Sequence, residues 1–391
     1  MLKTMARLLL FNPENDIALA HADANFTPTR AVTDFHNAGA ALPLWYGDRD
    51  GDMVLAPDVD HRWAERMRAE FHLPARLWDG TDAQPELAPW GFSLHALRQY
   101  SRCGVNVDME AWAPRIERIR MLSHRRTAAL LLARLRDRLP YPLPAIPAEA
   151  RSVADVERYA TATPCFFMKA PWSSSGRGVV CSKGVPASQL LRQAEGIIRR
   201  QGSVMLEPAL DKIQDFAALY EADSNGVRHI GFSVFFNANG ATAYGGNIVA
   251  ADHELLNILS RHADAGTIMS TAQTVSVELT RIGVHQAYCG CFGVDMMIYR
   301  PDGGGTPLIA PAVEINLRMT MGVVAHTLYE QLLPAESHGI FSVAYAPESV
   351  YDTAYVAENG RLIQGTLNLI PPHNGFRIRL SAGDHQAFSS R

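Results

Sequence analysis

Acidic, amide and guanidinium side chains gather on two apolar segments, GVDMMIY and APAVEINLRMTMG, which RPDGGGTPLI separates. A hairpin centred on residues 304–305 places Asp295 across from Glu314, because each lies about the same number of residues from the turn. Asn316 and Arg318 follow Glu314 at intervals of two, so these three side chains project from one face of an extended strand. The two carboxylates and the carboxamide therefore converge on that face.

These residue types suit a magnesium site that also holds phosphate. The side-chain oxygens of Asp295, Glu314 and Asn316 are ligands for an Mg²⁺ ion that keeps some waters and bridges substrate phosphates. Arg318 beside them can stabilise developing negative charge, and we expect it to be a catalytic residue. The alternative is a salt-bridged hairpin at the surface, but polar residues alternating within such apolar strands favour the metal site.

A second feature is the stretch FFMKAPWSSSGRGVV, residues 166 to 180, where a strand delivers Lys169 beside a loop rich in serine and glycine. Glycines let the backbone approach phosphate oxygens, hydroxyl and amide groups donate hydrogen bonds, and the lysine supplies a point charge. The loop residues that we expect to hold phosphate are Ser173, Ser174, Ser175, Gly176, Arg177 and Gly178. The spacing is not that of a P-loop, and the alternative is a flexible hairpin with a partly buried lysine.

Between these two features lies SVMLEPALDKIQDF, in which Glu207 ends an apolar strand. A strand that crosses into a linker in this way can hold a purine. We expect backbone groups of Ala209 and Leu210 to read the adenine edge, and an acid, Glu207 or Asp215, to reach the ribose hydroxyls.

Composition limits the classes of protein that remain. Hydrophobic residues make up 47% of the 391 and charged residues 19%, which excludes disorder for most of the chain. The net charge of −4, without a basic block, argues against nucleic acid or a membrane surface as a partner. Five scattered cysteines without CxxC spacing indicate neither a disulfide framework nor a zinc site, and we expect a cytoplasmic protein.

The order of expected elements indicates an α/β region followed by α+β architecture. A buried strand at 7–11 opens an α/β domain, a helix is expected at 123–139, and three prolines in YPLPAIPAEA mark a linker. From residue 215 the pattern becomes strand-rich, with helices near 252–263 and 270–287 and a hairpin around residues 359–360. The expected divisions are 1–118, then 119–345 with a smaller lobe at about 145–212 and a larger lobe at about 213–345, and a C-terminal extension, 346–391, packed on the core.

A lysine, a serine- and glycine-rich loop, an acid closing a strand, then an aspartate followed by Glu-x-Asn resembles the ATP-grasp superfamily over roughly residues 119–345. The resemblance implies two lobes that grip ATP, with Mg²⁺, or Mn²⁺, linking its phosphates to Asp295, Glu314 and Asn316 of the larger lobe. It also implies a pre-ATP-grasp-like domain before residue 119. Members tend to carry a further lysine at the start of the grasp domain; here Arg125 and Arg126 stand there, and Arg126 is the expected phosphate ligand.

The Glu-x-Asn-x-Arg form that ends at Arg318 is similar to that of biotin carboxylase and carbamoyl phosphate synthetase. The resemblance implies a ligase that activates a small-molecule or peptide carboxylate as an acyl phosphate and joins it to an amine or another nucleophile. A small-molecule kinase and a non-catalytic ATP-binding module remain alternatives, and a homo-oligomer is compatible with the sequence. Residues that could line the acceptor site are Glu14, Asn15 and Asp16 of the FNPEND segment, with His253 and His326.

Overall fold

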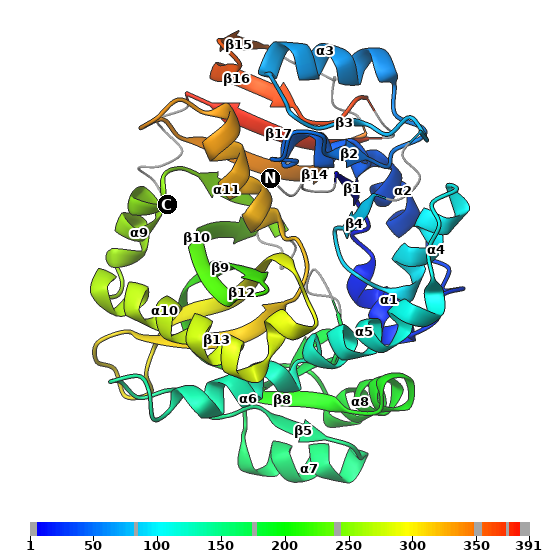
Figure 1. The fold of residues 1–391 in the computed structure, drawn as a ribbon. Helices are drawn as coiled ribbons and strands as arrows, with labels where there is room; N and C mark the ends of the chain where they lie inside the picture. Colours follow the sequence, from blue (N-terminus) through cyan, green and yellow to red (C-terminus); the bar gives the residue numbers. More distant parts are fainter. Residues whose placement is uncertain are drawn as a thin grey trace.

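The computed structural model describes residues 6–81, 85–173, 178–237, 244–347, 354–372 and 375–383. The chain forms three β-sheets (Figure 1). One lies in the N-terminal region, one in a small lobe formed by the middle of the sequence, and one in a large lobe. Within the described residues, no helix has both the length and the apolar character needed to cross a bilayer.

The N-terminal sheet has four parallel strands in the order β3-β2-β1-β4. Its strands are β1 (Arg7–Leu10), β2 (Met53–Val54), β3 (Arg76–Leu77) and β4 (Glu86–Pro89). The helices of this region are α1 (Asn15–His21), α2 (Arg30–Gly39), α3 (His61–Phe71), α4 (Leu94–Arg102) and α5 (Met109–Leu122), with a short 3-10 helix η1 (Leu42–Trp45). The apolar run of β1 is buried, as expected of a parallel strand covered on both faces. The predicted α/β character of this region is confirmed.

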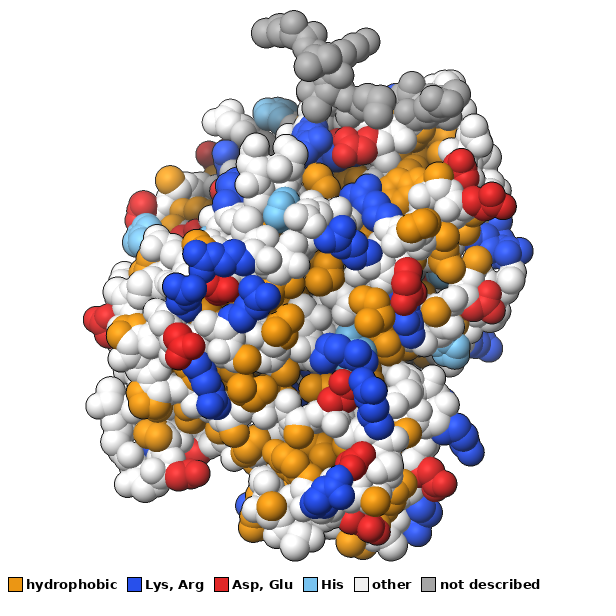
Figure 2. Space-filling view, turned by 60° about the horizontal axis from the view of Figure 1, so that its bottom comes forward, with side chains coloured by type: hydrophobic (Ala, Val, Ile, Leu, Met, Phe, Trp, Pro, Cys, Tyr) orange, Lys and Arg blue, Asp and Glu red, His pale blue; other side chains and the backbone are white. Residues whose placement is uncertain are grey.

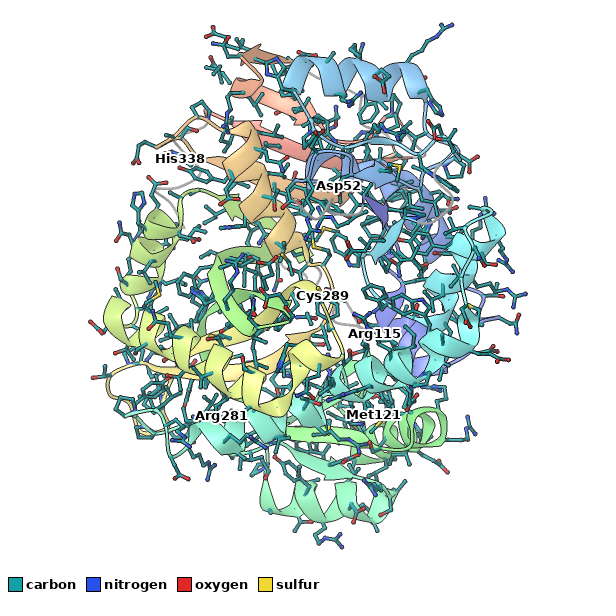
Figure 3. All side chains as sticks on the ribbon, in the orientation of Figure 1. Asp52, Arg115, Met121, Arg281, Cys289 and His338 are labelled. Atoms are coloured by element: carbon teal, nitrogen blue, oxygen red, sulfur yellow. The ribbon has the colours of Figure 1, made fainter. Side chains whose placement is uncertain are left out.

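Two polar contacts fix this region internally and against the rest of the molecule (Figure 3). The guanidinium of Arg7 on β1 donates through Nε to the buried carboxylate of Asp52 at 3.0 Å. The Nε of Arg115 on α5 donates to the carbonyl of Ala287 in the large lobe at 2.7 Å. Helix α5 therefore belongs to the N-terminal region and also contacts the large lobe.

The small lobe follows helix α6 (Arg126–Leu135), which begins three residues later than the predicted start at Ser123. Its antiparallel sheet has the order β5-β8-β6-β7. The strands are β5 (Ala148–Ala150), β6 (Phe166–Lys169), β7 (Val179–Cys181) and β8 (Val204–Pro208), and the helices are α7 (Val153–Ala162) and α8 (Ala187–Gln201). Lys169 pairs with Val179 across β6 and β7, which confirms the two strands predicted on either side of the serine-rich loop.

The large lobe is built on a nine-stranded sheet in the order β13-β12-β9-β10-β11-β14-β17-β16-β15. Its strands are β9 (Asp211–Asp223), β10 (Gly226–Asn237), β11 (Tyr244–Val249), β12 (Gly290–Arg300), β13 (Leu308–Asn316), β14 (Gly339–Tyr345), β15 (Tyr355–Glu358), β16 (Arg361–Asn368) and β17 (Phe376–Ala382). The expected division at residue 345 falls where β14 pairs along its length with β17. The C-terminal strands therefore continue the large sheet (Figure 1).

Helices α9 (Asp252–Ser260), α10 (Ala265–Ile282) and α11 (Met321–Leu332), with a 3-10 helix η2 (Val284–Gln286), pack on this sheet. The largest apolar cluster joins α6 and α10 to one face of β9 and β12, through residues such as Phe216, Ala218 and Val294. Residues of the opposite face alternate with these, so Ala217 and Leu219 belong to a separate, smaller cluster. The main core thus lies under one face of the sheet and leaves the other face for the candidate site.

Charged side chains of both signs are interspersed with apolar ones over the face drawn in Figure 2. This mixture agrees with the formal net charge of −4, which comes from 36 basic and 40 acidic residues. That face offers no extended block of one sign to a polyanionic partner.

Candidate functional site

The predicted pair of carboxylates is brought together by the hairpin of β12 and β13. Asp295 and Glu314 are directly opposed in the antiparallel register, and Gly293 is opposed to Asn316 one step further. Ile315 and Leu317 point into the main core, so the alternation predicted along this strand is confirmed. The hairpin prediction holds because both strands have a period of two and the turn lies midway between them.

Two negative charges held close together on this hairpin raise the cost of ionising both groups. Burial and then the charge of Glu314 raise the pKa of the Asp295 carboxyl well above its ordinary value. A hydrogen bond from Asn316 and the charges of Arg318 and Arg125 oppose this rise. Ionising both carboxylates is therefore unfavourable in this structure, and a bound cation would offset the repulsion between them.

Arg318 contributes its guanidinium to the same face and is held by the N-terminal region. Its Nη2 lies 2.7 Å from Asp16 Oδ2, and its Nε donates to the same carboxylate at 2.9 and 3.1 Å. Its Nη2 also donates to Asn316 Oδ1 at 3.1 Å. Burial lowers the pKa of Arg318, but the charge of Asp16 and the hydrogen bonds to it outweigh burial and leave the pKa raised. Asp16, from the FNPEND segment, therefore reaches the site.

Arg125 is the residue that links the two lobes at the site. Its Nη1 lies 2.8 Å from Glu314 Oε2 in the large lobe. From the same side chain, Nε donates to the carbonyl of Ala170 at 3.0 Å and Nη2 donates to Ser173 Oγ at 3.1 Å, both in the small lobe. The side chain is only 7% exposed, so these contacts form away from bulk water. Arg125 therefore connects the carboxylate pair to the loop that follows Lys169.

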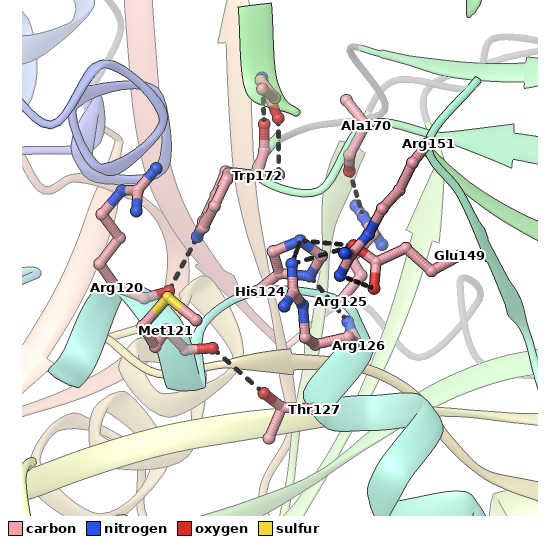
Figure 4. A network of polar contacts seen from close by, with 11 residues as sticks. Arg120, Met121, His124, Arg125, Arg126, Thr127, Glu149, Arg151, Ala170 and Trp172 are labelled. Atoms are coloured by element: carbon pink, nitrogen blue, oxygen red, sulfur yellow. Dashed lines mark hydrogen bonds and ion pairs between the residues drawn. The ribbon is translucent and has the colours of Figure 1, made fainter. Parts of the chain in front are cut away.

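Arg126, the expected phosphate ligand, faces a different partner (Figure 4). Its Nη2 lies 2.9 Å from Glu149 Oε1 on β5 and 3.0 Å from His124 Nε2. Burial and then the charge of Arg126 lower the pKa of His124 to about 4, so this imidazole is neutral near pH 7. Of the two adjacent arginines, the structure brings Arg125 to the carboxylate pair and directs Arg126 to the edge of the small-lobe sheet.

Residues just before these arginines also contact the start of the serine-rich loop (Figure 4). The indole Nε1 of Trp172 donates to the carbonyl of Arg120 at 2.9 Å, and the Arg120 guanidinium lies 4.1 Å from the Trp172 ring centroid. Gln201 of α8 exchanges two hydrogen bonds with the backbone of Trp172, at 3.0 and 3.1 Å. The start of the loop is thus fixed to α5 of the N-terminal region and to α8 of the small lobe.

Lys169 ends β6 next to this loop and forms an ion pair with Glu207, which stands opposite Phe167 on the neighbouring strand β8. Gly178 closes the loop with a φ of +72°, and an added Cβ would come within 3.0 Å of Ala170 Cβ, so glycine is required there. The predicted residues Ser173 and Gly178 therefore flank the loop entrance. The predicted residues Ser174, Ser175, Gly176 and Arg177 lie outside the described residues.

The expected adenine segment follows Glu207 directly. The Ala209 N–H donates to the carbonyl of Cys165 at 3.1 Å, so this N–H is already engaged within the small lobe, and Leu210 is the other backbone candidate for a purine edge. Asp215 lies on β9 two residues before Ala217, which is paired with Asp295, so Asp215 shares the sheet face of the carboxylate pair. Its carboxylate lies 2.6 Å from Lys212 Nζ.

The remaining candidates for the acceptor site lie in other surroundings. His253 on α9 lies 3.7 Å from Glu336, and His326 on α11 lies 3.7 Å from Asp252 and 3.6 Å from Glu330. Among the described residues, neither histidine forms an ion pair with Asp295 or Glu314. Two further candidates, Glu14 and Asn15, are buried in the N-terminal region, and Asn15 packs against Gly91.

The donor set fits Mg²⁺ or Mn²⁺ by its chemistry. Two carboxylates and one carboxamide oxygen converge, and burial and then the charge of Glu314 raise the pKa of Asp295. Hard divalent cations prefer such oxygen ligands, and they bind through one or two carboxylates when phosphates complete the coordination. Asp295, Glu314 and Asn316 are therefore the residues that could hold the metal.

No protein-family model and no curated protein sequence matches the chain. Among solved structures, the chain is similar to the biotin carboxylase from Campylobacter jejuni in a beta-gamma-ATP complex, with a TM-score of 0.50 and 11% identity over 97% of this chain and 88% of that chain. It is also similar to N5-carboxyaminoimidazole synthetase from Staphylococcus aureus, with a TM-score of 0.49 and 11% identity over 98% of this chain and 95% of that chain.

The likeness to biotin carboxylase runs over nearly all of both chains, and with the three sheets described above it defines the class of fold. The chain has the ATP-grasp fold, in which an N-terminal α/β domain is followed along the sequence by two lobes. The predicted fold is therefore confirmed, and the roles of individual residues rest on the geometry of this chain.

Proposed function

We propose that the chain is an ATP- and Mg²⁺-dependent ligase that forms a carbon–nitrogen bond. A substrate carboxylate attacks the γ-phosphorus of ATP, ADP leaves, and an acyl phosphate forms. An amine or another nucleophile then attacks the acyl carbon and releases phosphate. The ATP-grasp fold and the bound nucleotide analogue of the structurally similar biotin carboxylase support this reaction class.

The observation that carries the proposal is that Arg125 contacts both the acidic pair of the large lobe and the segment after Lys169 in the small lobe. On the large lobe, Asp295 and Glu314 form the strained carboxylate pair, with Arg318 beside them. On the small lobe, Lys169 ends the strand directly before Ala170, whose carbonyl accepts from Arg125. A purely structural hairpin does not require an acidic pair, a buried arginine and a loop lysine in one place.

The residues of the chain divide the work of phosphoryl transfer. When Mg²⁺ is bound, it neutralises phosphate charge and orients the phosphoryl group for in-line attack. Lys169 binds phosphate oxygens as a point charge, and Arg318 stabilises the negative charge that develops beside the acyl group. Leu210, between β8 and β9, and Asp215, on β9, position the nucleoside. No side-chain nucleophile is needed, because the fold supplies orientation and charge.

Product analysis tests this proposal. The purified protein is incubated with Mg-ATP and the small-molecule fraction of a bacterial extract, and ADP and free phosphate are measured. Glu314→Gln is the inactivating variant, and Glu110→Gln, at an exposed position on α5, is the matched control. Equal amounts of ADP and phosphate that depend on the extract, present in the wild type and Glu110→Gln and absent in Glu314→Gln, support the ligase.

Two other outcomes contradict it. ADP without free phosphate indicates a small-molecule kinase, because the phosphoryl group then stays on the product. ATP that binds without turnover in every fraction indicates a regulatory module.

A further inference from the structure

A cavity of about 410 Å³ lies at the carboxyl ends of β1 and β2 in the N-terminal domain. Leu10, Leu55 and Ala56 line it where those strands end, and Pro371 and Pro372 line it from the segment after β16. In open parallel sheets, ligands bind in the crevice outside the carboxyl ends of the strands. The volume is in the range of pockets that hold small molecules.

Charges of both signs stand at this cavity on different elements. Arg102 comes from the end of α4, and Asp58 comes from the segment between β2 and α3. Among the described residues no ion pair joins either of them to another group, and burial and then the charge of Asp58 raise the pKa of neighbouring Cys103. Asp60, a second acid at the cavity, is engaged as the N-cap of α3, because it accepts from the Arg62 N–H at 2.9 Å. The cavity therefore offers one cationic and one anionic group to a ligand.

Two polar side chains at the cavity are held by the buried carboxylate of Glu14. Gln99 donates through Nε2 to Glu14 Oε1 at 3.2 Å, and the same nitrogen lies 3.0 Å from His95 Nε2. His36, also at the cavity, is held through Nδ1 at 3.1 Å from Glu14 Oε2. Glu14 therefore holds both Gln99 and His36 in place at the cavity.

These observations together specify a small zwitterion with an apolar body. We propose that the cavity binds a free α-amino acid with an aliphatic side chain, as one of the two substrates that the ligase joins. The ammonium group contacts Asp58, the carboxylate contacts Arg102, and the side chain packs on Leu10 and Pro371. The role of the amino acid as a substrate rests on the proposed ligase function, whereas its binding is argued from the cavity alone.

The position of the cavity fits a substrate site. Glu14, which holds the floor of the cavity through Gln99 and His36, is two residues from Asp16, which holds Arg318. Because successive Cα atoms are about 3.8 Å apart, the two carboxylates belong to positions less than about 8 Å apart along the backbone. One short segment thus connects the cavity with the catalytic arginine.

Calorimetric titration without nucleotide tests the binding. The probes are L-leucine, 3-methylbutylamine, which lacks the carboxylate, and 4-methylpentanoate, which lacks the amine. We expect saturable binding of L-leucine, and binding at least about tenfold weaker for each analogue and for the Arg102→Gln and Asp58→Asn variants, because each loses one charge-assisted contact. Arg66→Gln and Asp50→Asn, at exposed positions outside the cavity, should bind L-leucine as the wild type does.

The analogues keep the test decisive even if a variant fails to fold, because they are measured on the wild-type protein. The proposal is overturned if L-leucine, L-isoleucine, L-valine and L-methionine all fail to bind with a Kd below about 10 mM, or if the analogues bind as tightly as L-leucine. Binding of L-leucine without any ATP turnover would keep the amino-acid site and remove the ligase. Turnover that depends on Glu314 without amino-acid binding would do the reverse.

Discussion

Replacing Arg125 by glutamine tests how the two lobes are joined at the site. The substitution removes the cation that lies 2.8 Å from Glu314 and two donors to the small lobe, from a side chain that is only 7% exposed. Removing one partner of a buried ion pair leaves the other charge uncompensated, at a cost of about 3–5 kcal/mol. Because Glu314 is 22% exposed, we expect the lower end of that range.

The adjacent arginine provides the matched control. Arg126 is 39% exposed, and its partner Glu149 is 19% exposed. An ion pair with one solvent-exposed partner contributes only about 0–1 kcal/mol. Arg126→Gln should therefore lower the free energy of unfolding by about 1 kcal/mol or less, and the two variants should differ by about 2 kcal/mol or more.

Urea unfolding followed by tryptophan fluorescence measures this difference, because Trp172 packs against Arg120 and directly follows Pro171, whose carbonyl accepts from the Arg125 N–H. A double-mutant cycle with Glu314→Gln isolates the pair. The double variant with Arg125→Gln should be destabilised less than the sum of the single variants, because no uncompensated carboxylate remains. Equal destabilisation by the two arginine variants, or strict additivity in the cycle, would refute the assignment of Arg125 as the buried partner of Glu314.

Three further perturbations follow from the contacts. Lys169→Met should raise the apparent KM for ATP by roughly tenfold or more in an ADP-release assay, since a charged phosphate contact is lost, and an unchanged KM would place the lysine outside the site. Asp16→Asn should lower kcat and leave the KM for ATP unchanged, because it loosens Arg318 without touching the nucleotide; a shift in KM alone would contradict that. Burial raises the pKa of Glu14, but hydrogen bonds from His36 and a second histidine outweigh it and lower the pKa from 4.5 to about 2, a difference that corresponds to roughly 3 kcal/mol. Glu14→Gln should lower the free energy of unfolding by about this much at neutral pH. The difference in free energy of unfolding between the variant and the wild type should disappear as pH falls from about 4.5 to about 2, where the wild-type carboxylate is protonated as well. A difference that does not depend on pH in urea unfolding would show that the charge of Glu14 is not responsible.

Local patterns in the sequence were sufficient for much of the site. The opposition of Asp295 and Glu314 follows from alternation within two strands and from the turn between them, all within about 25 residues. The strand that presents Lys169 and the glycine that closes the following loop follow from similarly local signals. Such features depend on side-chain period and turn chemistry, which neighbouring residues set.

Choices between adjacent residues needed the tertiary structure. Arg125 and Arg126 are the same residue type at consecutive positions, and the predicted helix start at Ser123 gave no reason to separate them. The helix begins at Arg126, and the backbone before it is tied to the loop after Lys169 by the bond from the Arg125 N–H to the Pro171 carbonyl at 3.2 Å. That contact turns one guanidinium toward Glu314 and leaves the other at the sheet edge.

The sequence by itself determined the fold class, the hairpin with its two acids, and the order of the lysine, the loop and the acidic strand ends. Only the tertiary structure decided that Asp16 holds Arg318, across 302 positions of the chain, and that the C-terminal strands extend the large sheet. Side-chain periodicity and turn residues depend on a few neighbouring positions, so they can be recognised in the sequence alone. Partners that are distant in the sequence are selected by the packing of whole layers, which no local pattern encodes.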